Sequence, residues 1–111
     1  MTYPIVVPDL EVYAGDTFAQ SYVFKTNAVP IDLSAWSGWV AKWQPYQGGT
    51  SITLTVTTTG LAVGSIVVNA TSAQTTAMGG PGLWDVSATN NGSVRTFLRG
   101  KTHYTEDVPN V

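Results

Sequence analysis

The side chain best suited to acid–base chemistry near neutral pH is the single histidine, His103. It lies in a polar stretch, on the face of a predicted final strand that also carries Arg99 and Lys101. A nucleophilic site needs a serine, cysteine or lysine within hydrogen-bond reach of such a base, and no motif around His103 provides one. We therefore interpret His103 as a surface or subunit-contact residue, with a catalytic base as the alternative. No catalytic residue is predicted, and the protein is expected not to be an enzyme.

The acidic residues are the second group that could do chemistry. They are Asp9, Glu11, Asp16, Asp32, Asp85, Glu106 and Asp107. Most fall at predicted strand ends or turns, where a carboxylate accepts backbone N–H bonds, and Asp85 is placed to pair with Arg95 or Arg99 across a hairpin. No loop has the alternating acidic spacing of a calcium site, and the glycines at 79–82 lack the lysine and serine or threonine of a phosphate loop. We predict no metal and no cofactor.

Three tryptophans, Trp36, Trp39 and Trp43, are spaced so that they could form a stacking platform for sugar rings. The alternative is that Trp39 and Trp43 point into the core together with Trp84, while Trp36 covers an edge. A carbohydrate-binding module is therefore one candidate function.

Composition restricts the partners. Charged residues make up 11% of the chain, whereas about 25% is usual, and sixteen threonines supply much neutral polar surface. A net charge of −2 argues against nucleic acid, because that affinity comes mainly from phosphate neutralisation. The chain has no cysteine, no apolar run of the ~18 residues that a membrane span needs, and no basic, apolar leader at its start. We expect a soluble protein that is synthesised in the cytoplasm of a host cell, with no membrane partner.

Alternating apolar and polar residues dominate the stretches that must position these groups. Such runs cover 18–25, 36–46, 51–59, 63–69, 83–89 and 94–104, and Asn91-Gly92 between the last two predicts a tight hairpin. One short helical turn is predicted within 71–78. This pattern favours a single all-β, antiparallel β-sandwich of immunoglobulin-like topology with about seven strands. The candidate core comprises Phe18, Tyr22, Phe24, Trp39, Trp43, Ile52, Leu54, Val56, Ile66, Val68, Trp84 and Val86.

The first ten residues are predicted to form an extended apolar arm. Pro4 and Pro8 favour extended backbone, and the candidate interface residues are Tyr3, Ile5, Val6 and Val7. The arm either packs as an edge strand on its own domain or contacts a neighbouring subunit. We therefore divide the chain into an arm (1–10), a sandwich (11–108) and a short tail (109–111).

A set of short phrases occurs in a fixed order along the chain. They are Gly15-Asp16-Thr17, Pro30-Ile31-Asp32-Leu33-Ser34, the helical turn at 71–78, Trp84-Asp85-Val86 and Leu98-Arg99-Gly100-Lys101. In this order over residues 11–108 the chain resembles small β-sandwich virion proteins of tailed bacteriophages, both standalone head proteins and amino-terminal domains of baseplate or tail-fibre proteins. The resemblance implies a non-enzymatic role in the virus particle and carries no catalytic residue with it.

The resembling baseplate domains continue into a further domain, whereas this chain stops at Val111. The resemblance therefore implies a minor capsid or decoration protein that binds and stabilises the head shell. Its expected partners are the major capsid protein and further copies of itself, and its expected location is the head surface of the virion. A tail or baseplate adaptor is the first alternative, and the carbohydrate-binding module is the second.

Overall fold

The computed structural model of the chain describes residues 4–46 and 48–105. Most of these residues lie in strands. The strands are β1 (Ile5–Val6), β2 (Leu10–Tyr13), β3 (Phe18–Val23), β4 (Lys25–Thr26), β5 (Val29–Pro30), β6 (Ser37–Pro45), β7 (Ile52–Gly60), β8 (Ser65–Ala70), β9 (Gly82–Asn90) and β10 (Ser93–Thr105). A 3-10 helix spans Leu61–Val63, and one α-helix, α1, spans Ser72–Met78.

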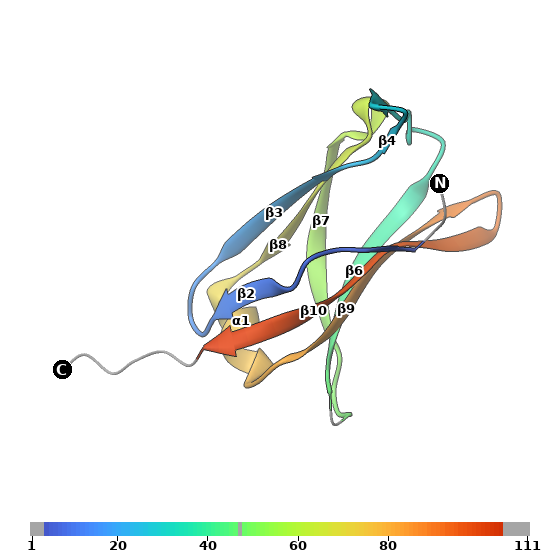
Figure 1. Cartoon of the computed structure of the whole chain (residues 1–111). Helices are drawn as coiled ribbons and strands as arrows, with labels where there is room; N and C mark the ends of the chain where they lie inside the picture. Colours follow the sequence, from blue (N-terminus) through green and yellow to red (C-terminus); the bar gives the residue numbers. More distant parts are fainter. Residues whose placement is uncertain (1–3, 47, 106–111) are drawn as a thin grey trace.

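Eight of the strands form one curled sheet with the order β1–β10–β9–β6–β7–β8–β3, and β2 also pairs with β10. The sheet curls at β7, whose residues 52–54 pair with β6, while residues 55–60 pair with β8. As a result, β3 and β8 lie opposite β2, β10 and β9 (Figure 1). The strands β4 and β5 form a separate small hairpin. The all-β, sandwich-like prediction therefore holds at this level.

Two details of the prediction were wrong. The described residues contain ten strands rather than about seven, because short strands such as β1, β4 and β5 carry too few residues to show an alternating pattern. The pairing is also not purely antiparallel, since both β1 and β2 run parallel to β10.

The arm expected over residues 1–10 enters the sheet from Ile5 onward, and β2 continues past residue 10 to Tyr13.

Local sequence explains the β9–β10 hairpin. Its two loop residues, Asn91 and Gly92, have φ angles of 51° and 81°. Asparagine and glycine tolerate such angles, and two successive positive-φ residues match the twist of the flanking strands. The hairpin places β9 and β10 in antiparallel register from Ser93 opposite Asn90 to Thr102 opposite Gly82, with a bulge at Phe97.

The helix α1 begins with a capping box. The Thr71 hydroxyl accepts from the backbone N–H of Gln74, and the Gln74 side chain accepts from the backbone N–H of Thr71. These bonds satisfy two N–H groups at the helix start, which explains why a helix as short as seven residues forms here. No helix in the described ranges is long and apolar enough to cross a lipid bilayer.

The core lies between the two faces of the curled sheet. Of the predicted core residues, Phe24, Trp43, Leu54, Ile66, Val68, Trp84 and Val86 are buried. Phe18, Tyr22, Trp39, Ile52 and Val56 are partly buried and pack against them. Further buried residues were not among the predicted ones: Val12, Leu33, Ala41, Ala70, Met78, Ala88, Phe97 and Leu98, and the polar Thr75 and Thr102.

One buried hydroxyl ties three strands together. The Trp43 indole N–H on β6 and the Gly82 backbone N–H on β9 each donate to Thr102 Oγ1 on β10 at 2.9 Å, and that hydroxyl donates to the Gly82 carbonyl at 3.3 Å. The indole reaches Thr102 by passing over Gly82, where an added Cβ would lie 2.6 Å from Trp43 Cε2. This hydroxyl joins β6, β9 and β10 in one layer through side-chain hydrogen bonds.

Candidate functional site

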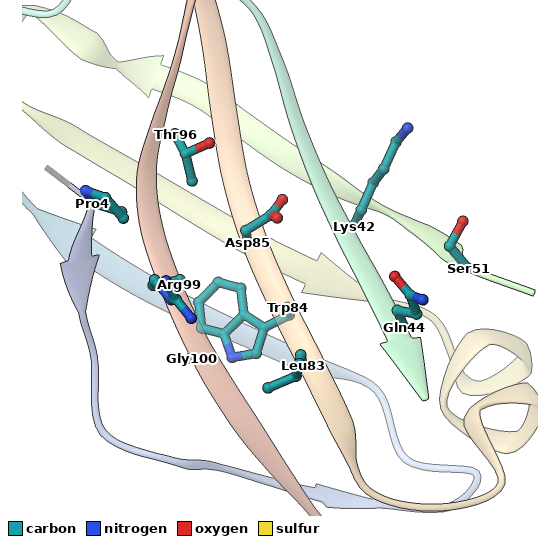
Figure 2. Close-up of a pocket in the computed structure, with 10 residues that line it drawn as sticks. All are labelled: Pro4, Lys42, Gln44, Ser51, Leu83, Trp84, Asp85, Thr96, Arg99 and Gly100. Atoms are coloured by element: carbon teal, nitrogen blue, oxygen red, sulfur yellow. The ribbon is translucent and has the colours of Figure 1, made fainter. Parts of the chain in front are cut away.

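A groove of about 590 Å³ crosses the outer face of that layer. Its lining residues come from the neighbouring strands β6, β9 and β10, from the arm and from the segment just before β7. Figure 2 shows Lys42, Asp85 and Arg99 on successive strands with Pro4 beside β10. The lining residues are Pro4, Lys42, Gln44, Ser51, Leu83, Trp84, Asp85, Thr96, Arg99 and Gly100.

The strand register explains why the three charged residues lie in a row. Asp85 on β9 is directly opposite Arg99 on β10 and also directly opposite Lys42 on β6. Residues directly opposite each other on neighbouring strands share a face and have Cβ atoms about 5 Å apart. The row is therefore built by backbone pairing. Of the two predicted partners of Asp85, Arg99 lies opposite it in register and Arg95 lies opposite Ala88, but neither forms an ion pair with Asp85 among the described residues.

The three charged side chains in this row do not form ion pairs with one another. Within residues 4–46 and 48–105, the one ion pair joins His103 and Asp9, so Lys42, Asp85 and Arg99 have no ion-pair partner among the described residues. Partial burial raises the pKa of the Asp85 carboxyl, while the charges of Lys42 and Arg99 act in the opposite direction. The groove can thus offer both cationic donors and a carboxylate acceptor to a bound surface.

The described part of the arm runs along one side of the groove, which Pro4 lines. Ile5 and Val7 are partly buried and pack against the core, whereas Val6 is 74% exposed and lies beside Arg99 in the register of β1 with β10. The Val7 N–H donates to the Arg99 carbonyl at 3.0 Å. The predicted interface residues therefore separate into two that face inward and one that faces outward, and Tyr3 lies outside the described residues.

Gly100 allows the arm to approach this closely. A Cβ there would lie 3.0 Å from both Val7 Cγ2 and Trp84 Nε1. With only hydrogen at this position, Val7 can pack over β10 beside the Trp84 indole. The position of the arm, and hence of Val6, depends on this glycine.

His103 lies on the exposed surface, where its Nε2 is 2.6 Å from an Asp9 carboxylate oxygen. Glu11 is the register neighbour of His103 on β2. Among the described residues, no three histidine, cysteine or acidic side chains gather closely enough to hold a metal ion. The pair links β10 to the segment between β1 and β2, which is a structural contact for an exposed histidine.

Asp32 and Asp16 take part in hydrogen bonds that hold the fold together. Asp32 accepts from the Ser34 backbone N–H at 2.9 Å and from the Ser34 hydroxyl, and these bonds lower the pKa of the Asp32 carboxyl. Asp16 contributes through its backbone, whose carbonyl accepts from the buried Thr75 hydroxyl at 2.8 Å. Glu106 and Asp107 lie outside the described residues.

The tryptophans are distributed over the core and its edge. Trp43 is buried, and Trp39 is partly buried with its indole N–H bonded to the Trp36 carbonyl. Trp36 meets Phe97 edge-on at 5.0 Å, and the Arg95 guanidinium lies 5.0 Å above the Trp36 ring. The Trp36 ring is thus in contact with both Phe97 and Arg95.

Sequence reasoning missed Lys42, Gln44 and Leu83 as neighbours of Asp85 and Arg99. All three lie at alternate positions on the outer sides of β6 and β9. The alternation in the sequence shows that they share a face with one another along each strand, but it does not show that β6 pairs with β9, because residues 46–81 separate the two strands.

No protein-family model matches the chain, and a search of the curated proteins likewise finds no match.

Proposed function

We propose that this protein is a non-enzymatic structural component of a tailed-bacteriophage virion, a minor capsid or decoration protein that binds and stabilises the head shell through its arm-side groove. The observation that carries the proposal is the exposed Val6 beside a row of charged side chains without ion-pair partners among the described residues. An apolar anchor rimmed by polar groups is the composition of a protein–protein interface. The head shell is proposed as the partner because the order of short sequence phrases over residues 11–108 resembles that of small β-sandwich virion proteins of tailed bacteriophages.

The mechanism in this proposal is mass action. Copies that bind the mature lattice, and not its precursor, add their binding free energy to the assembled state. Many weak contacts to one shell act together, because each bound copy holds the lattice in the arrangement that the next copy recognises. The low charge of the chain, 11% of residues, limits repulsion between closely packed copies.

The binding test adds the full-length chain to purified heads that lack it and measures co-sedimentation. We expect Val6→Asp to bind at least about tenfold more weakly, because the loss of one buried valine side chain costs about 1.5–3 kcal/mol. The matched control is Val94→Asp, since Val94 is 71% exposed at the far hairpin of β10. Equal binding by the Val6 variant and the wild type would overturn the proposed surface.

The location test labels intact virions with a gold-conjugated antibody against the protein. Gold over the head supports the proposal. Gold at the tail tip would replace it with the adaptor function, and particles without gold would contradict both virion functions and leave carbohydrate binding to be tested on a glycan column.

We further propose that the sandwich has immunoglobulin-like topology. The orders β6–β9–β10 and β7–β8–β3 follow the C–F–G and D–E–B orders of that fold, and the helix α1 occupies the connection before the strand that corresponds to F. Backbone interstrand NOEs between β3 and β8 and between β9 and β10 are expected in NMR spectra, and backbone NOEs that pair β3 directly with β6 would contradict the assignment.

A further inference from the structure

The strand β3 ends the curled sheet at the edge opposite the arm. Its residues Ala19, Gln20 and Ser21 are all exposed, and Val23 is 51% exposed. Its sequence, FAQSYV, contains no charged residue and no proline. Folded proteins usually protect an open edge with charges, prolines or bulges, because unpaired backbone groups pair readily with another strand. The edge at β3 has none of these protections.

The pairing with β8 identifies the backbone groups that face outward. The Phe24 N–H donates to the Gly64 carbonyl next to β8, and hydrogen-bonding directions alternate along a strand. The backbone groups of Ala19, Ser21 and Val23 therefore point away from β8. In agreement, the Ser21 carbonyl accepts a 3.3 Å hydrogen bond from the side chain of its neighbour Gln20 rather than from a strand.

We propose that β3 pairs antiparallel with β3 of a second copy of this chain, so that the layers β7–β8–β3 of both copies form one continuous sheet. A two-fold axis perpendicular to the sheet requires residues of the same face to lie opposite each other. One register uses every outward-facing backbone N–H and C=O group of Ala19, Ser21 and Val23. In it, Ser21 lies opposite Ser21 of the second copy, and Ala19 of each copy lies opposite Val23 of the other. It forms about six new backbone hydrogen bonds, two for each such pair.

Charge at the two ends of β3 favours a second copy in this orientation. Asp16 precedes the strand, Lys25 follows it, and both side chains are exposed. Antiparallel pairing brings the Asp16 end of each copy to the Lys25 end of the other, whereas parallel pairing would bring like charges together. Between these ends the strand is neutral, so nothing in it repels its own copy.

The side chains on the outer face of the continuous two-copy sheet are also compatible with this pairing. The residues in register with Ala19 and Ser21 on the inner strands are Asn69 and Val67 on β8, and Thr55 and Thr57 on β7. All are uncharged. The proposed pairing uses the edge opposite the groove and so leaves Val6 accessible in both copies.

The first test is sedimentation velocity of the full-length chain over a wide concentration range, with no other protein present. We expect a monomer–dimer equilibrium that Ser21→Lys weakens about tenfold or more, because the new charges lie opposite each other at the two-fold axis. The matched control Thr55→Lys adds the same charge to the same face two strands away and is expected to dimerise as the wild type does. A wild-type chain that stays monomeric, or a dimer that Ser21→Lys leaves unchanged, would overturn the proposal.

The second test uses cysteine cross-linking, which the absence of native cysteines makes unambiguous. Residues opposite each other on paired antiparallel strands are about 5.5 Å apart between Cα atoms, within the range that a disulfide spans. We expect Ser21→Cys to form a covalent dimer on mild oxidation and Thr55→Cys to remain monomeric. Equal cross-linking of both variants, or none of Ser21→Cys, would contradict the register. Because no head particle is present, this result is independent of the shell-binding proposal.

Discussion

Replacement of Thr102 by valine tests the contact that holds β6, β9 and β10 together. The Thr102 hydroxyl accepts two hydrogen bonds and donates one, which uses all of its bonding capacity. Valine has nearly the same shape but cannot accept. The Trp43 indole N–H and the Gly82 backbone N–H would both lose their acceptor inside a site where Thr102 is 3% exposed.

The expected cost follows from these two donors. A buried donor left without a partner costs about 1–3 kcal/mol, so Thr102→Val should lower the free energy of unfolding by about 2–6 kcal/mol. Thr102→Ser keeps the hydroxyl and removes one methyl group, which costs only about 1 kcal/mol. The more polar replacement is thus expected to be the less harmful one at a buried position.

The assay is urea denaturation followed by tryptophan fluorescence, with free energies from linear extrapolation. Thr105→Val, at an exposed position on the same strand, serves as the control and is expected to change stability little. A smaller loss of stability for Thr102→Val than for Thr102→Ser would show that the Thr102 hydroxyl does not satisfy both donors.

Three further predictions use other features of the structure. Gly82→Ala should lower the free energy of unfolding by about 1–3 kcal/mol or more in a thermal melt, because the new Cβ would lie 2.3 Å from the Gln44 carbonyl oxygen. Gly80 has open space around it, so Gly80→Ala should melt as the wild type does. Burial raises the pKa of Tyr22 to about 12, so an absorbance titration should contain a late-ionising component that Tyr22→Phe removes. The free energy of unfolding should fall as pH rises from about 10 to about 12, because Tyr22 ionises first in the unfolded chain. Desolvation raises the pKa of Asp85, so the ionised carboxylate opposes folding above that pKa. Asp85→Asn should therefore raise Tm at pH 7 and leave it unchanged at pH 3. A lower Tm at pH 7 would contradict this expectation.

The elements that could be predicted from sequence are those coded by neighbouring residues. The turn at Asn91 and Gly92 needs only two residues that accept positive φ, and the strand at 52–60 needs only its own alternation of apolar residues and threonine. The helix start at Thr71 is likewise a local pattern. Each of these was visible because its cause lies within a few residues.

The features that were missed depend on partners far apart in the chain. Parallel pairing of the arm with β10 joins Ile5 to Leu98, and no short-range signal specifies it. Thr102 is one of sixteen threonines, and only the fold brings the Trp43 indole to its hydroxyl. Phe97 is buried because a bulge turns it inward, which shifts the alternation expected over 94–104.

The parallel pairing of the arm with β10 has a consequence for mechanical load. Because β1 and β2 run in the same direction as β10, a force that pulls the Pro4 end away from the Thr105 end acts along the strands (Figure 1). Such a force shears all the hydrogen bonds between the arm and β10 at once, whereas a hairpin pulled from its open end gives way one bond at a time. If the protein binds a head shell as proposed, a pull between neighbouring subunits would load this parallel pairing, and β1, which presents Val6, would be among the strands that carry the tension.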